Sequence, residues 1–468
     1  MTDLDLSYLS IAEASARIEA GTLTPTELVE AVFARIDETE PRLNAYVRLM
    51  RDTAIAEAQA ATLRGASGQR LGPLDGIPIA VKDLFDTAGV ITTGGTGSYI
   101  ERVPANDATA VRLLHAAGAV ILGKTNTHEL ALGGTTNNVH YGATHNPWNL
   151  AYVPGGSSGG SGAALAAGSA LGALGTDTGG SVRIPAAFCG ITGYKPTYGL
   201  VGRGGVLPLS PTLDHVGPMA RTVEDCALML NALQGYDPTD LDSVPTEWQD
   251  FTSNLEGGVH GLRLGVMPSM LVGCADGTRA AFERALATFV GLGAAIIEVE
   301  PMAGFDDWSS PTAPIIVTEG ATVNEPILRE HPETVGEPVR RRILRGLDAN
   351  VHDYFRALEF RKVIEQRFEA ALGPGGEVDA ILLPTALDTA ELIGDSPEDE
   401  RSPVDKFLTT RIFNHTHQPS LSVPCGLDGA GLPVGLMIST AKWRDALALR
   451  IGHTFQQATD FHTQRPPL

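Results

Sequence analysis

Two small clusters of glycine and serine contain the residues best suited to chemistry. Residues 155–161 read Gly-Gly-Ser-Ser-Gly-Gly-Ser, and residues 178–181 read Thr-Gly-Gly-Ser. Glycines beside a serine allow the backbone to turn sharply and to direct several N–H groups at one point, which is how an oxyanion hole is built. We therefore expect Ser181 to be a nucleophile in the turn after a strand that ends at Asp177.

A serine hydroxyl is too weak an acid to attack an amide unaided, so a neighbouring group must accept its proton. Lys82 is one candidate, because it ends the apolar run within residues 73–83. A desolvated lysine has a lowered pKa and can act as a neutral base. Ser157 would then relay the proton from Ser181 to Lys82 and return it to the leaving nitrogen of an amide.

A second serine mechanism also fits this stretch. The pattern G-x-S-x-G occurs twice, around Ser157 and around Ser158, and is typical of an elbow nucleophile served by a distant Asp and His. The histidines available as its base are His215, His352, His415, His417 and His453. A flexible linker is disfavoured, because residues 162–175 are uncharged and carry small residues at helical spacing. The residues alone leave both serine mechanisms open.

Two other kinds of site are not expected. Residues 118–125 match the phosphate-loop pattern G-x4-G-K-[ST], but the four residues between the glycines form an apolar strand instead of a flexible loop. His415 and His417 lack a third ligand nearby, so they are interpreted as loop or pocket residues. We predict no bound nucleotide, no metal and no cofactor.

The composition limits the class of protein. The 468 residues are 43% hydrophobic, with 53 Gly and 30 Pro, as in a globular α/β protein with many tight turns. The net charge of −21 argues against a nucleic-acid partner, which normally meets a basic face. The start of the chain lacks a signal pattern and no run is apolar enough to span a membrane, so we expect a cytoplasmic protein. Four scattered cysteines are expected to be buried free thiols, namely Cys189, Cys226, Cys274 and Cys425.

The elements that must position the serines and the lysine follow from periodicity and capping. Capping boxes at Ser10 with Glu13 and at Thr24 with Glu27 each predict a helix start. The remaining predicted helices are residues 50–63, 107–117, 277–291 and 445–459, one within 162–175, and several within 311–372. The predicted strands lie in residues 73–83, 119–123, 261–267, 294–299, 378–384, 421–423 and 435–438, with a short one before residue 178.

The chain resembles the amidase signature family of serine hydrolases. The motifs that carry this resemblance lie at residues 76–83, 118–130, 154–168, 175–199 and 213–227, in the family's order, with a weaker match at 422–438. The resemblance implies an α/β fold with a single large mixed, twisted sheet covered by helices on both faces. We expect one domain over residues 1–468, divided into N-terminal helices (1–72), a signature core (73–230), a helical cap over the site (305–375) and a C-terminal part that completes the sheet (376–468).

The resemblance also implies roles for individual residues. Ser181 is the nucleophile, Ser157 is a relay that follows a cis peptide bond, and Lys82 is the base. The implied oxyanion donors are backbone N–H groups of Thr178, Gly179, Gly180 and Ser181. Ser158, Asp177 and Arg183 match positions that support this loop, and a structural ion pair is the preferred interpretation of the last two. The implied pocket residues are Leu130, Ala131, Leu132 and Gly133.

Members of this family differ in the amide that they cleave. Subunits of tRNA amidotransferases typically carry Arg-Gln-Pro after the nucleophile, whereas this chain has Ile184 at the middle position. The helical face of Tyr354, Ala357 and Arg361 also looks like that of free-standing amidases. We therefore expect a monomeric or homodimeric amidase that hydrolyses an apolar or aromatic amide, an anilide or a carbamate, without contact to nucleic acid or membrane. A glutaminase-type subunit of a tRNA-dependent amidotransferase is the alternative, and a binding protein with an inactive site is disfavoured because all three catalytic positions are filled.

Overall fold

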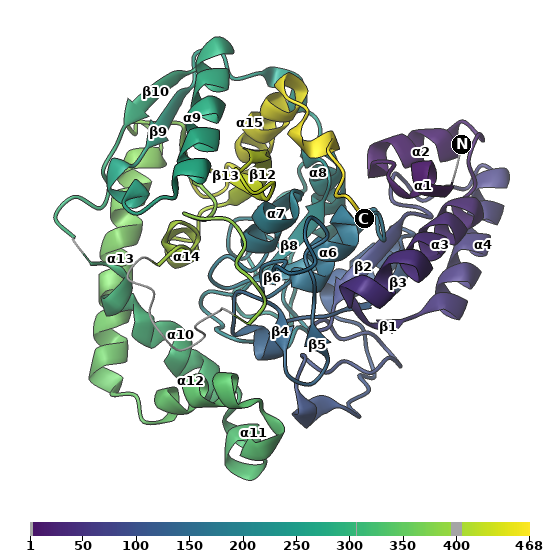
Figure 1. The fold of residues 1–468 in the computed structure, drawn as a ribbon, viewed down its shortest axis with the longest axis horizontal. Coiled ribbons are helices and arrows are strands. Elements are labelled where there is room, and N and C mark those ends of the chain that lie inside the picture. The colour runs from purple at the N-terminus through teal and green to yellow at the C-terminus, as the bar shows by residue number, and fades with distance from the viewer. Residues whose placement is uncertain (1–2, 306, 395–404) are drawn as a thin grey trace.

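The computed structural model describes residues 3–305, 307–394 and 405–468, and it is built around one large sheet (Figure 1). The strands are β1 Tyr46–Leu49, β2 Pro78–Lys82, β3 Val120–Thr125, β4 Asn137–Asn138, β5 Gly142–Ala143, β6 Gly172–Asp177, β7 Thr192–Lys195, β8 His215–Ala220, β9 Arg263–Val266, β10 Ala295–Glu298, β11 Ala380–Pro384, β12 Ser420–Leu427 and β13 Pro433–Ser439. The helices are α1 Asp3–Ser7, α2 Ile11–Glu19, α3 Pro25–Leu43, α4 Arg51–Ala66, α5 Thr109–Ala116, α6 Gly159–Ala166, α7 Arg183–Cys189, α8 Val223–Leu233, α9 Asp276–Gly291, α10 Ser309–Val323, α11 Glu325–Glu330, α12 Glu337–Leu347, α13 Val351–Leu372, α14 Leu408–His415 and α15 Asp445–Ala458.

The first long helices begin where their capping residues predict. The Ser10 hydroxyl accepts a hydrogen bond from the Glu13 N–H at 3.0 Å, and the Glu13 carboxylate accepts one from the Ser10 N–H at 2.9 Å. Thr24 and Glu27 form the same reciprocal pair at the start of α3. These boxes satisfy N–H groups that have no partner within the helix, so both predicted helix starts are confirmed.

In the described part of the chain, eleven strands form one sheet in the order β1-β3-β2-β6-β8-β7-β12-β13-β11-β9-β10. The centre of the signature core is parallel, because β2 pairs parallel with both β3 and β6. The next strand, β8, is antiparallel to β6. Parallel neighbours end at the same edge of a sheet, so the C-terminal ends of β2 and β6 lie side by side.

Helices cover both faces of this sheet, as the fold class predicted from the sequence requires. On one side α6 and α7 contact each other, and α7 packs on β7, β12 and β13. In a second group α15 contacts α8 and α9, and each of these three helices packs on the sheet. The α6 helix consists of Gly, Ser, Ala and Leu and is buried throughout, since small side chains allow close approach of its backbone to its neighbours.

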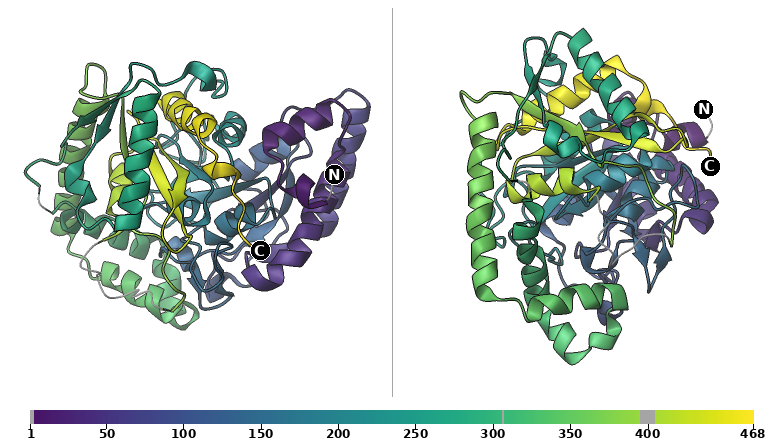
Figure 2. Two further views of the ribbon diagram at one scale, coloured as in Figure 1. Left: turned by 45° about the horizontal axis from the view of Figure 1, so that its top comes forward. Right: turned by 60° about the vertical axis from the view of Figure 1, so that its left-hand side comes forward.

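The C-terminal half adds a strand-helix-strand unit and a helical layer. Strand β9, helix α9 and strand β10 follow the predicted order, and β9 pairs parallel with both β10 and β11. Helices α10 to α13 form a separate layer at the lower left of Figure 1, and the views in Figure 2 show that α13 runs along one side of the molecule. The C-terminal segment returns to the N-terminal helices, where the Arg465 guanidinium lies 4.3 Å from the centre of the Tyr8 ring.

The described helices include none with the length and apolar character that a membrane crossing requires. The four cysteines are free and buried, as predicted.

Candidate active site

Lys82 and Ser157 lie in hydrogen-bonding contact at the end of the central strands. Lys82 is the last residue of β2, and its Nζ donates to the Ser157 Oγ at 2.8 Å. The same Nζ donates to the Thr176 Oγ1 at 2.7 Å. Thr176 lies near the end of the neighbouring parallel strand β6, so the sheet topology brings the lysine and the threonine together. Lys82 and Ser157 are fully buried.

The environment of Lys82 favours its neutral form. Burial lowers its pKa from 10.5 to about 7, while the charges of Asp177 and Asp214 act in the opposite direction. Desolvation penalises the ammonium, because a charge loses more by leaving water than a neutral amine does. A lysine with a pKa near neutrality can accept a proton and can also give it back.

The backbone around Ser157 is closely packed against neighbouring segments. The peptide bond between Gly156 and Ser157 is cis. The Ser157 carbonyl accepts hydrogen bonds from the His128 N–H and from the Thr127 hydroxyl, each at 3.0 Å. A Cβ on Gly156 would lie 2.7 Å from the Thr135 N, so only glycine fits against the backbone that passes here.

Ser181 lies in the turn between β6 and α7, at the position that the sequence predicts. Its backbone carbonyl accepts a hydrogen bond from the Ser158 N–H at 3.2 Å, which joins the two glycine-serine clusters. Gly180 has a φ of 127°. A side chain at Gly180 would strain the backbone and would meet the Thr410 Oγ1 at 2.4 Å, so this position in the turn requires glycine.

A buried ion pair supports the same turn. The Arg183 Nε and Nη2 donate to the two carboxylate oxygens of Asp177 at 3.0 and 2.8 Å. The Asn414 Nδ2 donates to Asp177 Oδ1 at 2.9 Å, and the Asn414 Oδ1 accepts from Arg183 at 2.7 Å. Although burial acts against it, the Arg183 charge and these hydrogen bonds hold the pKa of Asp177 well below its usual range. The carboxylate is therefore ionised, and it also accepts hydrogen bonds from the Gly180 and Val182 N–H groups on either side of Ser181.

The loop of residues 178–181 offers backbone donors near Ser181. The Gly180 N–H donates to Asp177 Oδ1 at 2.8 Å, so it is engaged in holding the turn. This contact makes Thr178, Gly179 and Ser181 the stronger candidates among the four N–H groups predicted from the sequence.

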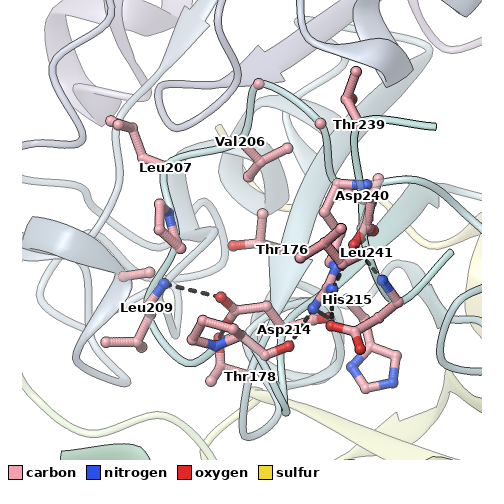
Figure 3. Close-up of a pocket in the computed structure, with 18 residues that line it drawn as sticks. Thr176, Thr178, Val206, Leu207, Leu209, Asp214, His215, Thr239, Asp240 and Leu241 are labelled. Carbon is pink, nitrogen blue, oxygen red and sulfur yellow. Dashed lines mark hydrogen bonds and ion pairs between the residues drawn. The ribbon is translucent and has the colours of Figure 1, made fainter. Parts of the chain in front are cut away.

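A cavity of about 280 Å³ borders the site (Figure 3). Its lining includes Thr176, which also contacts Lys82, and Thr178, which begins the Ser181 loop. Its other lining residues are Ala131, residues 203–209, Pro211, residues 214–216 and residues 239–242. The lining combines apolar residues such as Leu207 and Leu209 with the carboxylates of Asp214, Asp240 and Asp242 and with Arg203.

Of the four predicted pocket residues, Ala131 lines this cavity and the other three do not. Leu130 and Leu132 are buried against Val335 and Val339 of the helical layer. At Gly133, a Cβ would lie 2.2 Å from the His128 ring. Leu130 and Ala131 adopt φ values of 50° and 59°, which L residues rarely do, and such conformations cluster at functional sites.

The hydrogen bonds of the structure give no support to a histidine base. The Ser157 hydroxyl bonds to Lys82, and the Ser158 hydroxyl contacts the backbone N and O of Thr176, both at 3.3 Å. His215 is the predicted base nearest the cavity, but its Nδ1 lies 2.7 Å from the Leu213 carbonyl and its Nε2 lies 3.3 Å from the Lys195 Nζ. Burial lowers the pKa of His215, so the ring is neutral.

The other four candidate histidines do not contact the serines. His417 stacks on Tyr198 with ring centres 4.3 Å apart, and His415 lies against Trp308. The His453 Nε2 lies 2.8 Å from the Glu256 carboxylate, and His352 is exposed on α13. Within residues 3–305, 307–394 and 405–468, no cluster of three or more His, Cys, Asp or Glu side chains could hold a metal ion.

Sequence reasoning missed several residues of the site. Thr176 and Thr127 carry hydroxyls that look like ordinary strand or loop positions in the sequence, although Thr176 directly precedes the predicted Asp177. Asn414 lies more than two hundred positions from its partners, and nothing in its neighbourhood signals the contact. Asp214 lies within one of the family motifs, but its neighbours in the sequence indicate no role for it.

Three comparisons place the chain among known proteins. A family model described as Amidase matches residues 27–449. A glutamyl-tRNA(Gln) amidotransferase subunit of Chloroflexus aurantiacus is 41% identical over 99% of this chain and 99% of its own length.

Solved structures also resemble this chain over nearly its whole length. The corresponding amidotransferase subunit of Thermotoga maritima has a TM-score of 0.80 and 32% identity, covering 98% of this chain and 96% of its own. A chain from a vestigial protein complex that reveals the evolutionary origins of an s-triazine catabolic enzyme has a TM-score of 0.90 and 34% identity, covering 96% of this chain and 98% of its own.

These relatives contradict two predictions made from the sequence. The prediction of a free-standing amidase for apolar amides, anilides or carbamates is wrong, because the full-length relatives are named as subunits of an amidotransferase. The prediction of a monomer or homodimer with only a small-molecule substrate is wrong for the same reason.

The structure explains why Ile184 misled the prediction. Ile184 lies on α7, is 3% exposed and packs with Val153 and Phe188. It does not line the cavity, so the absence of an amide side chain there says little about the substrate. Tyr354 and Arg361 likewise attach α13 to its neighbours, with the Tyr354 hydroxyl 2.9 Å from Glu319 and Arg361 2.9 Å from the Thr212 hydroxyl.

Proposed function

This chain belongs to the amidase signature family of enzymes that act on carbon–nitrogen bonds, and from that premise we propose that it is the amide-hydrolysing subunit of a glutamyl-tRNA(Gln) amidotransferase. Its substrate is then the side-chain amide of glutamine, from which it releases ammonia for the amidation of glutamyl-tRNA. The observation that carries the proposal is the 41% identity with a glutamyl-tRNA(Gln) amidotransferase subunit over 99% of both chains.

The geometry supports a serine acyl-enzyme mechanism. Ser181 attacks the amide carbon and passes its proton to Ser157, which passes its own proton to neutral Lys82. The 2.8 Å contact between Lys82 and Ser157 supports the second transfer. Backbone N–H groups of Thr178, Gly179 and Ser181 stabilise the oxyanion of the tetrahedral intermediate.

The same relay then runs in reverse. The C–N bond breaks as Lys82 returns its proton through Ser157 to the leaving nitrogen, which departs as ammonia. Water attacks the acyl-enzyme along the same proton path and frees glutamate and Ser181. A pKa of about 7 suits both directions, because the base must gain and lose a proton in each cycle.

We assign the contact with tRNA to other subunits of the assembly. This chain carries a net charge of −21, and binding to phosphates is driven by cationic surfaces. The chain therefore supplies ammonia, and its partners hold the RNA. A cytosolic location is supported by the four free thiols.

The test compares the chain alone with the chain co-purified with the other subunits of its amidotransferase. Ammonia release from glutamine, and glutamine-dependent amidation of glutamyl-tRNA(Gln), are measured in both preparations. We expect amidation only in the assembly and expect it to be lost in Ser181→Ala. Wild-type assembly that leaves glutamine intact while the chain cleaves an anilide or a carbamate would refute the proposal. Measuring carbamate hydrolysis in the same two preparations tests the carbamate-cleaving (urethanase) activity predicted from the sequence.

A further inference from the structure

Asp214, a residue with no role in the mechanism above, contacts both the Ser181 loop and the cavity. We propose that Asp214 is a positioning residue for amide hydrolysis: its carboxylate fixes the loop that carries the oxyanion donors and supplies negative charge to the cavity that adjoins Lys82. The inference rests on the proposed use of Ser181, Ser157 and Lys82.

The contacts of Asp214 join two loops that meet at the site. Its Oδ1 accepts a hydrogen bond from the Thr178 hydroxyl at 2.6 Å. Its Oδ2 accepts hydrogen bonds from the N–H groups of Leu209 and Ser210 at 2.9 and 3.0 Å. Figure 3 shows Asp214 between Leu209 and Thr178. The Asp214 carboxylate therefore connects Thr178, the first residue of the oxyanion loop, to the cavity-lining loop at Leu209 and Ser210.

The strands place this carboxylate close to the reacting groups. Asp214 directly precedes β8, whose first residue His215 pairs with Asp177 at the end of β6. Asp214 and Thr176 line the same cavity, and the Thr176 hydroxyl contacts the Lys82 Nζ. Asp214 is only partly buried because its side chain faces this cavity.

The donors to Asp214 differ from those to Asp177. Both oxygens of Asp177 are bonded to the Arg183 guanidinium, which compensates its charge. The three donors to Asp214 are neutral, and burial raises its pKa while these hydrogen bonds lower it. The charge of Asp214 is therefore less compensated than that of Asp177, and it acts on Lys82 from the side of the cavity.

Other titratable groups lie near Lys82 and Asp214. Asp177 from β6 acts on Lys82 in the same direction as Asp214. His128, whose pKa is lowered to about 3 by burial and by nearby Arg342 and Lys82, is neutral. Arg203 is paired with Asp240 and Asp242 at 2.7 Å, but it also donates to the Asp214 carbonyl at 3.4 Å, and its charge acts to lower the pKa of Asp214.

Asp83 follows Lys82 in the chain but pairs with Lys124 at 3.6 Å. Lys195, close to His215, has its own pKa lowered by burial.

The negative charge of Asp214 determines the direction in which it shifts the pKa of Lys82. A nearby carboxylate stabilises the ammonium form of Lys82 and so raises its pKa against the effect of burial. Removing the carboxylate lowers the pKa of Lys82. The neutral base then persists to lower pH, but it is a weaker acceptor and slower to activate Ser181.

The test measures the rate at which a fluorophosphonate labels Ser181, as a function of pH, in wild type and Asp214→Asn. We expect the midpoint of the acid limb to move down by about one pH unit and the plateau rate to fall several-fold. The matched control is Asp225→Asn, because burial raises the pKa of Asp225 as it does that of Asp214, but Asp225 lies on α8 and bonds to the Ala12 N–H of α2. Its midpoint should equal that of wild type.

A second variant separates the two roles. Thr178→Val removes the hydrogen bond to Asp214 but keeps the carboxylate, so the plateau should fall without a downward shift of the midpoint. An Asp214→Asn midpoint equal to that of wild type, or a Thr178→Val plateau equal to that of wild type, overturns the proposal. If the Asn variant does not fold, Asp214→Ser provides the same neutral test.

Labelling needs no glutamine, so its outcome is independent of the proposed substrate. Absence of glutamine turnover alongside a shifted midpoint would refute the proposed substrate and leave the role of Asp214 intact. Absence of wild-type labelling at Ser181 would overturn both roles of Asp214 together with the proposed nucleophile.

Discussion

At the scale of single residues, the site depends on what burial does to charge. Lys82, Asp177 and Arg183 are all fully buried. Burial favours the neutral form of Lys82, whereas Asp177 keeps its charge. Lys82 makes its two contacts with neutral hydroxyls, so desolvation lowers its pKa to about 7. Asp177 is bonded to a guanidinium and to an amide, so it stays ionised. The partners therefore decide which buried group can lose its charge near neutral pH and which stays ionised.

The role of Lys82 can be tested directly. Lys82→Ala should lower ammonia release by about 100- to 10,000-fold, the usual contribution of a general base. Wild-type activity should rise with pH through about 7, because only the neutral amine accepts a proton. Steady-state rates across pH check both expectations.

Lys82→Arg provides the matched control for Lys82→Ala. It keeps a cation at the position but stays protonated, so it should be as inactive as the alanine variant. An arginine variant with the wild-type rate and pH profile would exclude Lys82 as the base.

A second residue-scale prediction concerns Asp177. Asp177→Asn leaves Arg183 buried without its counter-ion and should lower the free energy of unfolding by about 3–5 kcal/mol. Denaturant unfolding followed by fluorescence measures this change. The control is Asp353→Asn, which breaks the exposed pair with Arg356 and should have no measurable effect. Equal stability of the Asp177 and Asp353 variants would contradict the structural role.

At the scale of elements, we propose that residues 305–375 form a cap over the site, with the N-terminal helices, the signature core and the C-terminal strands as the other parts of one domain. Helices α10 to α12 pack on the segment that contains Ala131 through a shared apolar cluster. The Arg342 guanidinium donates to the Leu132 carbonyl at 3.1 Å. These contacts couple the helical layer to the site.

Glu129 is the point at which this coupling is most easily tested. Its carboxylate accepts hydrogen bonds from the Gly336 N–H at 2.9 and 3.1 Å, immediately before α12 begins at Glu337. Glu129→Ala removes a charged acceptor that is worth about 1.5–3 kcal/mol, so amide exchange in α12 should become at least about tenfold faster. Hydrogen-exchange mass spectrometry measures this rate.

A control variant comes from the same layer. Glu325→Ala breaks only the exposed ion pair with Arg329 on α11, and it should leave α12 exchange unchanged. Unchanged α12 exchange in Glu129→Ala would show that the Glu129 carboxylate does not hold the start of α12.

At the scale of the whole molecule, the reactivity of the four thiols shows whether the folded protein keeps them away from solvent. Burial raises the pKa of each thiol, to about 12 for Cys425, so the thiolate that reacts with alkylating agents is scarce. Native protein treated with iodoacetamide should show little mass increase, while denatured protein should gain four adducts. Rapid alkylation of native protein at Cys189 or Cys226 would contradict the burial of these residues.

The sequence alone determined much of the fold and the outline of the site. The capping boxes set two helix starts, the apolar run set β2 with Lys82 at its end, and the glycine-serine clusters set the turns around Ser157 and Ser181. Each of these signals is local, because it depends on neighbouring residues and on backbone freedom. The same local signals could not identify the substrate, and Ile184 pointed to the wrong group of relatives because its burial on α7 is a tertiary property.

Only the tertiary structure decided which distant groups meet. The parallel pairing of β2 and β6 places the Thr176 hydroxyl on Lys82, and α14 carries Asn414 to the Asp177–Arg183 pair. The start of β8 places Asp214 beside Thr178. The pKa of Lys82 also depends on the whole fold, because desolvation is produced by all the elements that exclude water from one amine.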